Sequence, residues 1–254
     1  MTPPAPAGIL GESVSPSLKS NLDRVRARVA QAARSAGRSP EEVLLVAVTK
    51  SVEPEVAADL VRLGQLALGE SRASELERKD DHLRAQGLSP RWHFVGHLQG
   101  NKVRRVVARA DAIQSVDSLR LLEAIDRAAG ELGRRNEVWI QVKLAEEPTK
   151  SGLPPSEVRA VVERARELEH VELAGLMALG PLVQPDERDA SARAVFQDLA
   201  RLARELAPGA AMGDARGLGR MRTSMGMSGD FEAAIEAGSD LVRIGTLLFE
   251  GALR

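Results

Sequence analysis

Lys50 is the residue of this sequence best placed for covalent chemistry, because it directly follows the short apolar segment 43–49. A segment that is apolar on both faces is typical of a buried parallel strand. Side chains alternate along a strand, so Val46, Val48 and Lys50 share one face and the lysine ends it. Burial lowers a lysine pKa from about 10.4, which frees the amine to form a Schiff base. A lysine that reaches from the strand end into solvent is the alternative.

Few other amines could take this role. Lys19 and Lys79 fall on expected helices, where we expect them to be solvated. Lys143 ends another apolar strand and is a direct competitor, and Lys150 falls in the loop that follows it. The sequence therefore offers two strand-end amines, with a third lysine close by in the chain.

Two glycine-containing segments near the end of the chain, 224–230 and 243–246, have the composition of a phosphate site. Glycine lets backbone N–H groups approach an anion closely, and Ser224 and Thr246 add hydroxyl donors. In (β/α)8 barrels, phosphate often binds at the loops after the seventh and eighth strands. One such loop is a weak signal, whereas two at the expected strands favour phosphate.

Two further polar residues fall on strand faces that we expect to point inward. Arg243 shares a face with Leu241 and Gly245, where an unpaired guanidinium would be costly. Its partner is either an acidic neighbour or a ligand. For His93, we expect a satisfied core histidine rather than a metal ligand, because no acidic residue lies at ligand spacing beside it.

The elements that must position these residues alternate between short apolar strands and amphipathic helices. The predicted strands are 43–49, 66–69, 92–96, 112–116, 138–144, 173–179, 221–225 and 241–245. The predicted helices are 17–37, 55–63, 72–86, 101–108, 118–132, 155–168, 186–206 and 229–237. Eight strands separated by helices predict a single (β/α)8 barrel. A doubly wound open sheet is the alternative, but its Gly-x-Gly-x-x-Gly turn is missing after the first strand.

Domain organisation follows from composition. Residues 1–16 carry four prolines among small residues, which predicts a disordered Pro-rich tail. From residue 17 to 254 no break in composition marks a boundary, and 43% apolar residues are enough for a sizeable core. We therefore expect one barrel domain over 17–254.

Charge and residue usage exclude several classes of function. With 35 basic and 36 acidic residues the formal charge is −1, which excludes the broad cationic surface of a nonspecific nucleic-acid or lipid binder. Cysteine is absent, which excludes disulfides, thiolate nucleophiles and Cys-ligated zinc. No apolar stretch reaches the roughly 18 to 20 residues of a membrane span, and a signal-peptide pattern is missing. We expect a cytoplasmic protein without nucleic-acid, membrane or metal partners.

Several segments, taken together and in order, resemble the pyridoxal phosphate homeostasis family. They are VAVTK at 46–50, LGE at 68–70, WHFVGHLQGNK at 92–102, KSG at 150–152, SMGMS at 224–228 and VRIGT at 242–246. The resemblance runs from about residue 20 to the end and implies a barrel similar to the N-terminal domain of fold-type III enzymes such as alanine racemase. It also implies pyridoxal 5'-phosphate (PLP) bound to a lysine, which by position is Lys50.

The resemblance implies further cofactor contacts. The phosphate contacts fall on Ser224, Met225, Gly245 and Thr246, and the contact to the pyridine nitrogen falls on Arg243. We add His93 to this predicted cofactor-binding set. Ser71 and Lys143 stand where the family reads the Asn of Gly-Glu-Asn and of Val-Asn, so contacts from those two loops are not carried over. The glycine-rich stretch 213–219 is also a local variation.

The residues argue for a carrier rather than an efficient enzyme. An arginine at the pyridine nitrogen is a cation and a donor only, which weakens the electron sink that carbanion chemistry uses. Racemisation needs acid–base groups on both faces of the α-carbon, and alanine racemases take one from a tyrosine supplied with a second domain. This chain contains no tyrosine.

The family resemblance implies a protein that binds PLP, delivers it to apo PLP-dependent enzymes and influences amino-acid and vitamin B6 balance. We expect it to be a monomer. One alternative is a low-activity PLP-dependent amino-acid racemase or lyase with Lys50 as its sole base. Another is a Schiff-base aldolase acting on sugar phosphates, which would use the same lysine without the cofactor.

Overall fold

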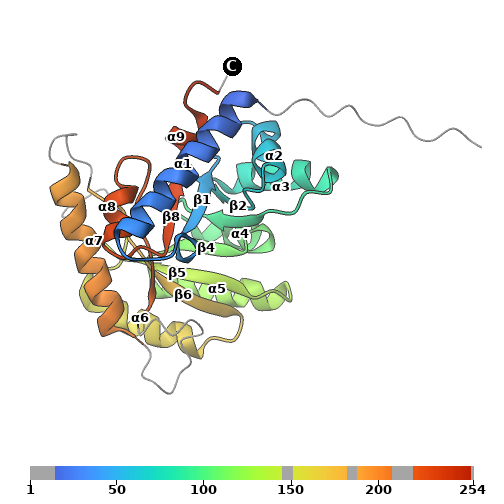
Figure 1. Cartoon of the computed structure of the whole chain (residues 1–254). Helices are drawn as coiled ribbons and strands as arrows, with labels where there is room; N and C mark the ends of the chain where they lie inside the picture. The colour runs from blue at the N-terminus through green and yellow to red at the C-terminus, as the bar shows by residue number, and fades with distance from the viewer. Residues whose placement is uncertain (1–14, 145–150, 182–187, 208–219, 253–254) are drawn as a thin grey trace, which may run out of the picture.

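The computed structural model describes residues 15–144, 151–181, 188–207 and 220–252. Parallel strands form a closed barrel in chain order, and the last strand pairs with the first. The strands are β1 (Leu44–Val48), β2 (Ala67–Glu70), β3 (Arg91–Phe94), β4 (Ala112–Val116), β5 (Asn136–Gln141), β6 (Val171–Met177), β7 (Arg222–Ser224) and β8 (Leu241–Ile244). This arrangement is a (β/α)8 barrel, so the predicted fold class is confirmed (Figure 1).

Helices surround the strands. They are α1 (Pro16–Ser35), α2 (Pro54–Arg62), α3 (Ala73–Ala85), α4 (Val103–Arg109), α5 (Leu119–Glu131), α6 (Pro155–Glu167), α7 (Arg188–Glu205), α8 (Phe231–Glu236) and α9 (Thr246–Phe249). Short 3-10 turns lie at Pro40–Glu42 and Gly100–Lys102. Within the described ranges, no helix is both long and apolar enough to cross a membrane.

Most element boundaries lie close to the predicted ones, and two differences matter for the site. The first helix begins at Pro16, inside the predicted tail, because proline suits the first turn of a helix, where its missing N–H costs nothing. Residues 1–14 of the predicted tail are outside the described residues. The short helix α9 was not predicted, since its four residues are too few to show a helical period.

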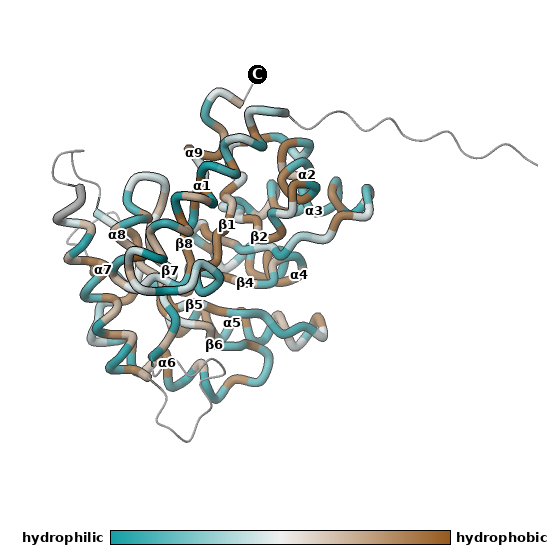
Figure 2. The backbone as a smooth tube through the Cα atoms, viewed as in Figure 1, coloured by the Kyte–Doolittle hydropathy of each residue, from teal (hydrophilic) through white to brown (hydrophobic). Residues whose placement is uncertain are grey.

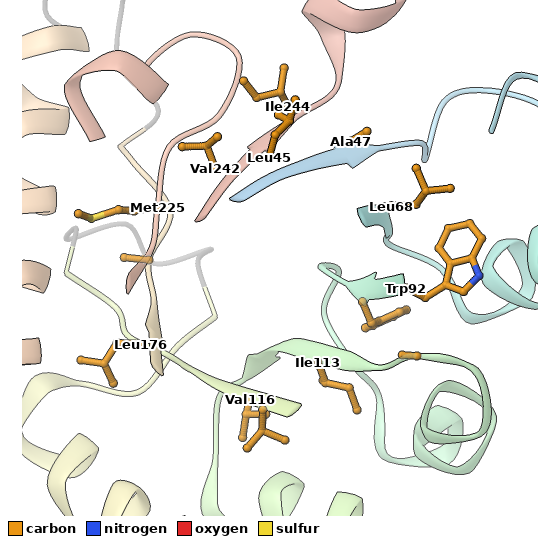
Figure 3. Packing of buried hydrophobic residues seen from close by; sticks show 14 of the residues in the cluster. Leu45, Ala47, Leu68, Trp92, Ile113, Val116, Leu176, Met225, Val242 and Ile244 are labelled. Carbon is orange, nitrogen blue, oxygen red and sulfur yellow. The ribbon is translucent and has the colours of Figure 1, made fainter. Parts of the chain in front are cut away.

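The apolar residues form two layers on either side of the strands. Between the strands and the helices lies a large cluster, part of which Figure 3 shows, with Leu45 and Ala47 from β1 among its members. Inside the barrel lies a small cluster of Val46, Ala67, Trp139, Met177 and Leu241. Successive residues of β1 thus alternate between outside and inside, as the pleat of a strand requires. Figure 2 shows hydrophobic colour along the strands and, alternating with hydrophilic colour, along the helices.

The first helix closes the barrel against the end of the chain. The Asn21 amide donates to the carbonyl oxygens of Leu248 (3.1 Å) and Glu250 (2.9 Å), so α1 is tied to α9 (Figure 1). Arg28 of the same helix pairs with Glu232 of α8 at 2.5 Å. Because α9 begins at Thr246, the contact between Asn21 and α9 supports the predicted phosphate loop 243–246 from the helix side.

Candidate functional site

Lys50 lies at the carboxyl end of β1, in the turn that follows Thr49. Val46 points into the barrel, and Lys50 lies two residues beyond the last residue of β1, at the barrel mouth. Its side chain is exposed, so the desolvation that we expected for this amine is not provided by the protein alone. The amine is therefore open to a ligand that enters the mouth.

Lys143 stands across the mouth from Lys50. It follows β5, which is four strands away from β1 in the closed order, and its side chain is half-buried. Its N–H donates to Leu153 O at 2.9 Å, and a Cβ at Gly152 would fall 2.9 Å from the same nitrogen. Only glycine permits this close approach. Lys143 remains a second strand-end amine, while Lys150 lies outside the described residues.

A chain of buried polar side chains crosses the barrel from β8 to β3. Arg243 is only 4% exposed and donates to Ser224 Oγ and, at 3.0 Å, to Ala178 O. The Ser224 hydroxyl donates in turn to Gln114 Oε1 at 2.7 Å. Gln114 Nε2 lies 2.9 Å from His93 Nδ1. Four strands thus contribute to one hydrogen-bonded network under the mouth.

This network fixes the state of His93. Gln114 Oε1 accepts from Ser224, so its Nε2 donates to His93 Nδ1, and the histidine proton is assigned to Nε2. Burial lowers the pKa of His93 to about 4, so the ring is neutral at pH 7. Within the part of the chain that the structure describes, Nε2 has no hydrogen-bond partner. The expectation of a satisfied core histidine therefore holds for Nδ1 and fails for Nε2.

Arg243 is a buried cation held by uncharged groups. The ion pair with an acidic neighbour that we considered is not found among the described residues, and its hydrogen-bond partners are a hydroxyl and a carbonyl. Burial lowers the pKa of Arg243 to about 10, opposed by the negative charge of Asp230, so the guanidinium stays protonated at pH 7. A cation in this position can still attract an electron-rich group of a ligand.

The predicted phosphate residues differ in how open they are. Thr246 is exposed at the start of α9, and Gly245 precedes it, with its N–H 3.3 Å from Ser228 Oγ. Met225 is less available, because its N–H donates to Leu241 O at 3.1 Å and its side chain is buried. The Ser224 hydroxyl is likewise engaged in the buried network. The open part of this site is therefore the loop after β8.

Glycine is required at Gly226, in the loop after β7, and allows a close approach at Gly245, in the loop after β8. Gly226 has φ +95°, and a Cβ there would fall 2.6 Å from the Cβ of Ala234. A Cβ at Gly245 would fall 3.1 Å from Val48 O, so the ends of β8 and β1 pack closely there. Lys50 thus stands two residues beyond the point where β1 touches the loop after β8.

Lys79 corrects the sequence prediction. It was expected to be solvated, yet its side chain is 0% exposed, and its Nζ donates to Thr49 O at 2.7 Å and pairs with Glu70. The reason is helical spacing, because Lys79 lies three residues after Leu76 and four before Leu83, on the face of α3 that packs against the barrel. That spacing was visible in the sequence. Gln114 was also missed, because no local pattern distinguishes it from other strand residues.

The opposite end of the barrel also contains a cavity, of about 530 Å³. It lies among first residues of strands, such as Leu44 and Ala67, far from the carboxyl ends. Three of its charged residues pair with one another, because Glu137 is held by Arg91 at 2.5 Å and by Arg222 at 3.4 Å. Catalytic and binding residues of these barrels lie at the other end, so we assign no ligand here.

Comparison with known proteins gives the class of the barrel. Residues 20–252 match the family model described as "Alanine racemase, N-terminal domain". A D-threonine aldolase from Filomicrobium marinum, 18% identical with a TM-score of 0.69 over 93% of this chain and 61% of that one, shares the fold. The described barrel thus has the fold of this N-terminal domain.

Closer relatives define the family within this class. Proteins named pyridoxal phosphate homeostasis protein from Aquifex aeolicus (strain VF5) and Escherichia coli (strain K12) are 35% and 36% identical, over 90% of this chain and 95% and 94% of their own lengths. The structure of PipY from Synechococcus elongatus PCC7942 with PLP bound is 33% identical, with a TM-score of 0.76 over 91% of this chain and 99% of that one. The chain belongs to the pyridoxal phosphate homeostasis protein family, which confirms the resemblance seen in the sequence.

Proposed function

We propose that this protein binds PLP at the carboxyl end of its barrel, as a Schiff base on Lys50, and serves intracellular PLP homeostasis and amino-acid balance. It holds the cofactor and delivers it to apo PLP-dependent enzymes without efficient turnover. The observation that carries the proposal is the position of three residues relative to one another. The exposed amine of Lys50 and the open loop at Thr246 end two neighbouring strands, and the buried cation Arg243 lies below them.

The residues fit a phosphorylated pyridoxal. Thr246 offers a hydroxyl donor to the phosphate, next to Gly245, whose N–H is bonded to Ser228 Oγ at 3.3 Å, and Arg243 offers the pyridine nitrogen a donor that no carboxylate contacts within the described residues. Ser224 and Met225 contribute mainly by holding this arrangement, since their polar groups are already bonded. His93 acts through Gln114 on the same network. Support also comes from the relative PipY, whose structure contains PLP.

The site is unsuited to efficient catalysis on the amino-acid α-carbon. PLP supplies an electron sink when it is bound, and that sink is strongest when its ring nitrogen is protonated. Arg243 is charged at neutral pH and cannot accept a proton, so it favours the unprotonated ring. The neutral His93 is engaged by Gln114 at 2.9 Å, and the chain has no tyrosine to act as a second acid or base.

The experiment that tests the proposal follows the covalent bond. Purified protein is titrated with PLP, its absorption near about 420 nm is recorded before and after borohydride, and the modified lysine is mapped by mass spectrometry. We expect a reducible adduct on Lys50 and transfer of PLP to an apo-enzyme added afterwards. A sugar-phosphate aldolase would be purified without this absorption, and an adduct only on other lysines would remove Lys50 from the proposal.

The proposal includes a cytoplasmic location and a monomeric state. The first is tested by fractionation of the cells that express the gene. The second is tested by light scattering of the PLP-loaded protein, where a mass near the 27.2 kDa of one chain is expected. A stable dimer would contradict the monomeric state, and the second copy would then have to be placed relative to the mouth of the barrel.

A further inference from the structure

An ion pair lies completely buried beneath Lys50. Lys79 of α3 and Glu70 at the end of β2 contact each other through Nζ and Oε1, and both side chains are 0% exposed. Lys79 Nζ also donates to the carbonyl oxygen of Thr49 at 2.7 Å. That carbonyl belongs to the peptide bond that links Thr49 to Lys50. The pair therefore contacts the backbone directly before the proposed Schiff-base lysine.

The other hydrogen bonds of Glu70 reach the same small region. Its Oε1 accepts from the Thr49 hydroxyl at 3.1 Å, and its Oε2 accepts from the Ser71 N–H at 3.0 Å. The Thr49 carbonyl accepts a second bond, from the N–H of Val52 at 3.1 Å, which closes the turn that contains Lys50. The carboxylate and the ammonium thus hold the ends of β1 and β2 and the turn between β1 and α2.

Stability alone does not account for this pair. Removing two charges from water is expensive, and well-packed apolar residues in place of a buried ion pair are often neutral or stabilising. Position 79 lies on the apolar face of α3 between Leu76 and Leu83, where a methionine would fit the surroundings. All the polar contacts of Lys79 are instead directed at the strand ends next to Lys50. The benefit of the pair is therefore geometric.

We propose that Lys79 and Glu70 are positioning residues for Lys50. By fixing the peptide plane between Thr49 and Lys50, they set the direction in which the Lys50 side chain leaves the backbone, into the mouth of the barrel. This inference rests on the proposed function, because the orientation of the Lys50 side chain matters only if Lys50 binds PLP. Small displacements of a reacting group have large effects, so losing the bond to Thr49 lowers the affinity for PLP at least about tenfold.

The test compares three variants of the full chain. Lys79→Met removes the donor to Thr49 but leaves Glu70 buried without its partner. Lys79→Met/Glu70→Gln also removes that unpaired charge, so it restores stability if the single variant is unstable. Asp80→Asn is the matched control, because Asp80 is the next residue of α3, is 1% exposed and accepts from Trp92 Nε1 (3.1 Å) and Arg109 (2.9 Å) instead.

Each variant is measured for its thermal midpoint, its titration with PLP near about 420 nm, the pH dependence of that absorption and the borohydride-mapped lysine. We expect both Lys79 variants to bind PLP at least about tenfold more weakly, with a displaced pH profile, even where the double variant melts at the wild-type temperature. Asp80→Asn should lower the melting temperature and leave the titration unchanged.

Two results overturn the inference in different ways. If the double variant recovers both wild-type stability and wild-type PLP affinity, the pair has only a structural role. The same conclusion follows if Asp80→Asn loses as much PLP affinity as the Lys79 variants. In both cases the wild-type adduct on Lys50 would leave the proposed function intact. Wild-type protein that forms no adduct on Lys50 would instead overturn the proposed function and this inference together.

Discussion

Acidification should destabilise the folded protein through His93, because this ring is buried as a neutral group. Burial lowers its pKa from 6.5 to about 4, with Arg91 and Arg222 acting in the same direction and Glu137 opposing them. The folded pKa lies below the unfolded one, so the unfolded chain takes up the proton first as the pH falls. The stabilising effect of the neutral ring is therefore nearly complete at pH 7 and is lost as the pH falls from 6.5 to about 4.

The size of the loss follows from the two pKa values. The pKa of His93 is 6.5 in the unfolded chain and about 4 in the folded protein. Linkage then lowers the free energy of unfolding by about 0.2 kcal/mol at pH 7 and by about 2.5 kcal/mol at pH 4.5. The saturating value at lower pH is about 3.4 kcal/mol, since one pKa unit is worth about 1.4 kcal/mol. An effect of this size is a large part of the stability of an ordinary domain.

The assay is urea unfolding of the apo-protein, followed by the fluorescence of Trp92 and Trp139, which are both fully buried. Wild type and His93→Gln are compared at pH 7 and pH 4.5, because glutamine is uncharged at both values and can still accept from Gln114. Other groups titrate alike in the two proteins and cancel in the comparison. Wild type should lose about 2.3 kcal/mol more than the variant between the two pH values. Equal losses would refute the neutral, buried state of His93.

Three further predictions concern the mouth of the barrel. Lys50→Ala should abolish the borohydride-reducible adduct while the far-ultraviolet circular dichroism stays that of the wild type; an adduct retained on Lys143 would show that the wrong amine was chosen. Ser224→Ala/Thr246→Ala should weaken PLP binding at least about tenfold, because Thr246 loses a bond to the phosphate, worth about 1.5 to 3 kcal/mol, and Arg243 loses the Ser224 hydroxyl that holds it; an unchanged titration would exclude both residues from the site. L- and D-alanine should stay essentially uninterconverted in deuterium oxide by chiral chromatography, and turnover of about 1 to 10³ per second would refute the carrier proposal.

The fold was predictable because its signals are local and repeated. Each strand is a short apolar segment and each longer helix has an apolar face, so eight alternations were enough to indicate the barrel. The alternation of side chains along β1 also gave the inward direction of Val46, whereas the direction of Lys50, which lies in the turn after the strand, stays a prediction. The loops after β7 and β8 were found from glycine and hydroxyl residues at the ends of those strands.

The buried polar contacts were not predictable in the same way. Gln114 contacts Ser224 110 positions further along the chain, and nothing in either neighbourhood in the sequence indicates that β4 and β7 face each other across the barrel. Lys79 is different, because its spacing from Leu76 and Leu83 already places it on the apolar face of α3, although most lysines are exposed. Sequence patterns report which face a residue occupies, whereas its partner depends on closure of the barrel.

The charges near the mouth are distributed unevenly, and this asymmetry bears on how a ligand is oriented. Beside Lys50, the positive charge of Lys79 is neutralised by Glu70 in direct contact. On the β7–β8 side, Arg243 is bound by a hydroxyl and a carbonyl, so within the described residues its positive charge has no carboxylate in contact. Charges in a partly desolvated site act strongly because little water screens them. The field therefore favours the anionic and electron-rich parts of PLP towards β7 and β8, which leaves its aldehyde for the amine at the end of β1.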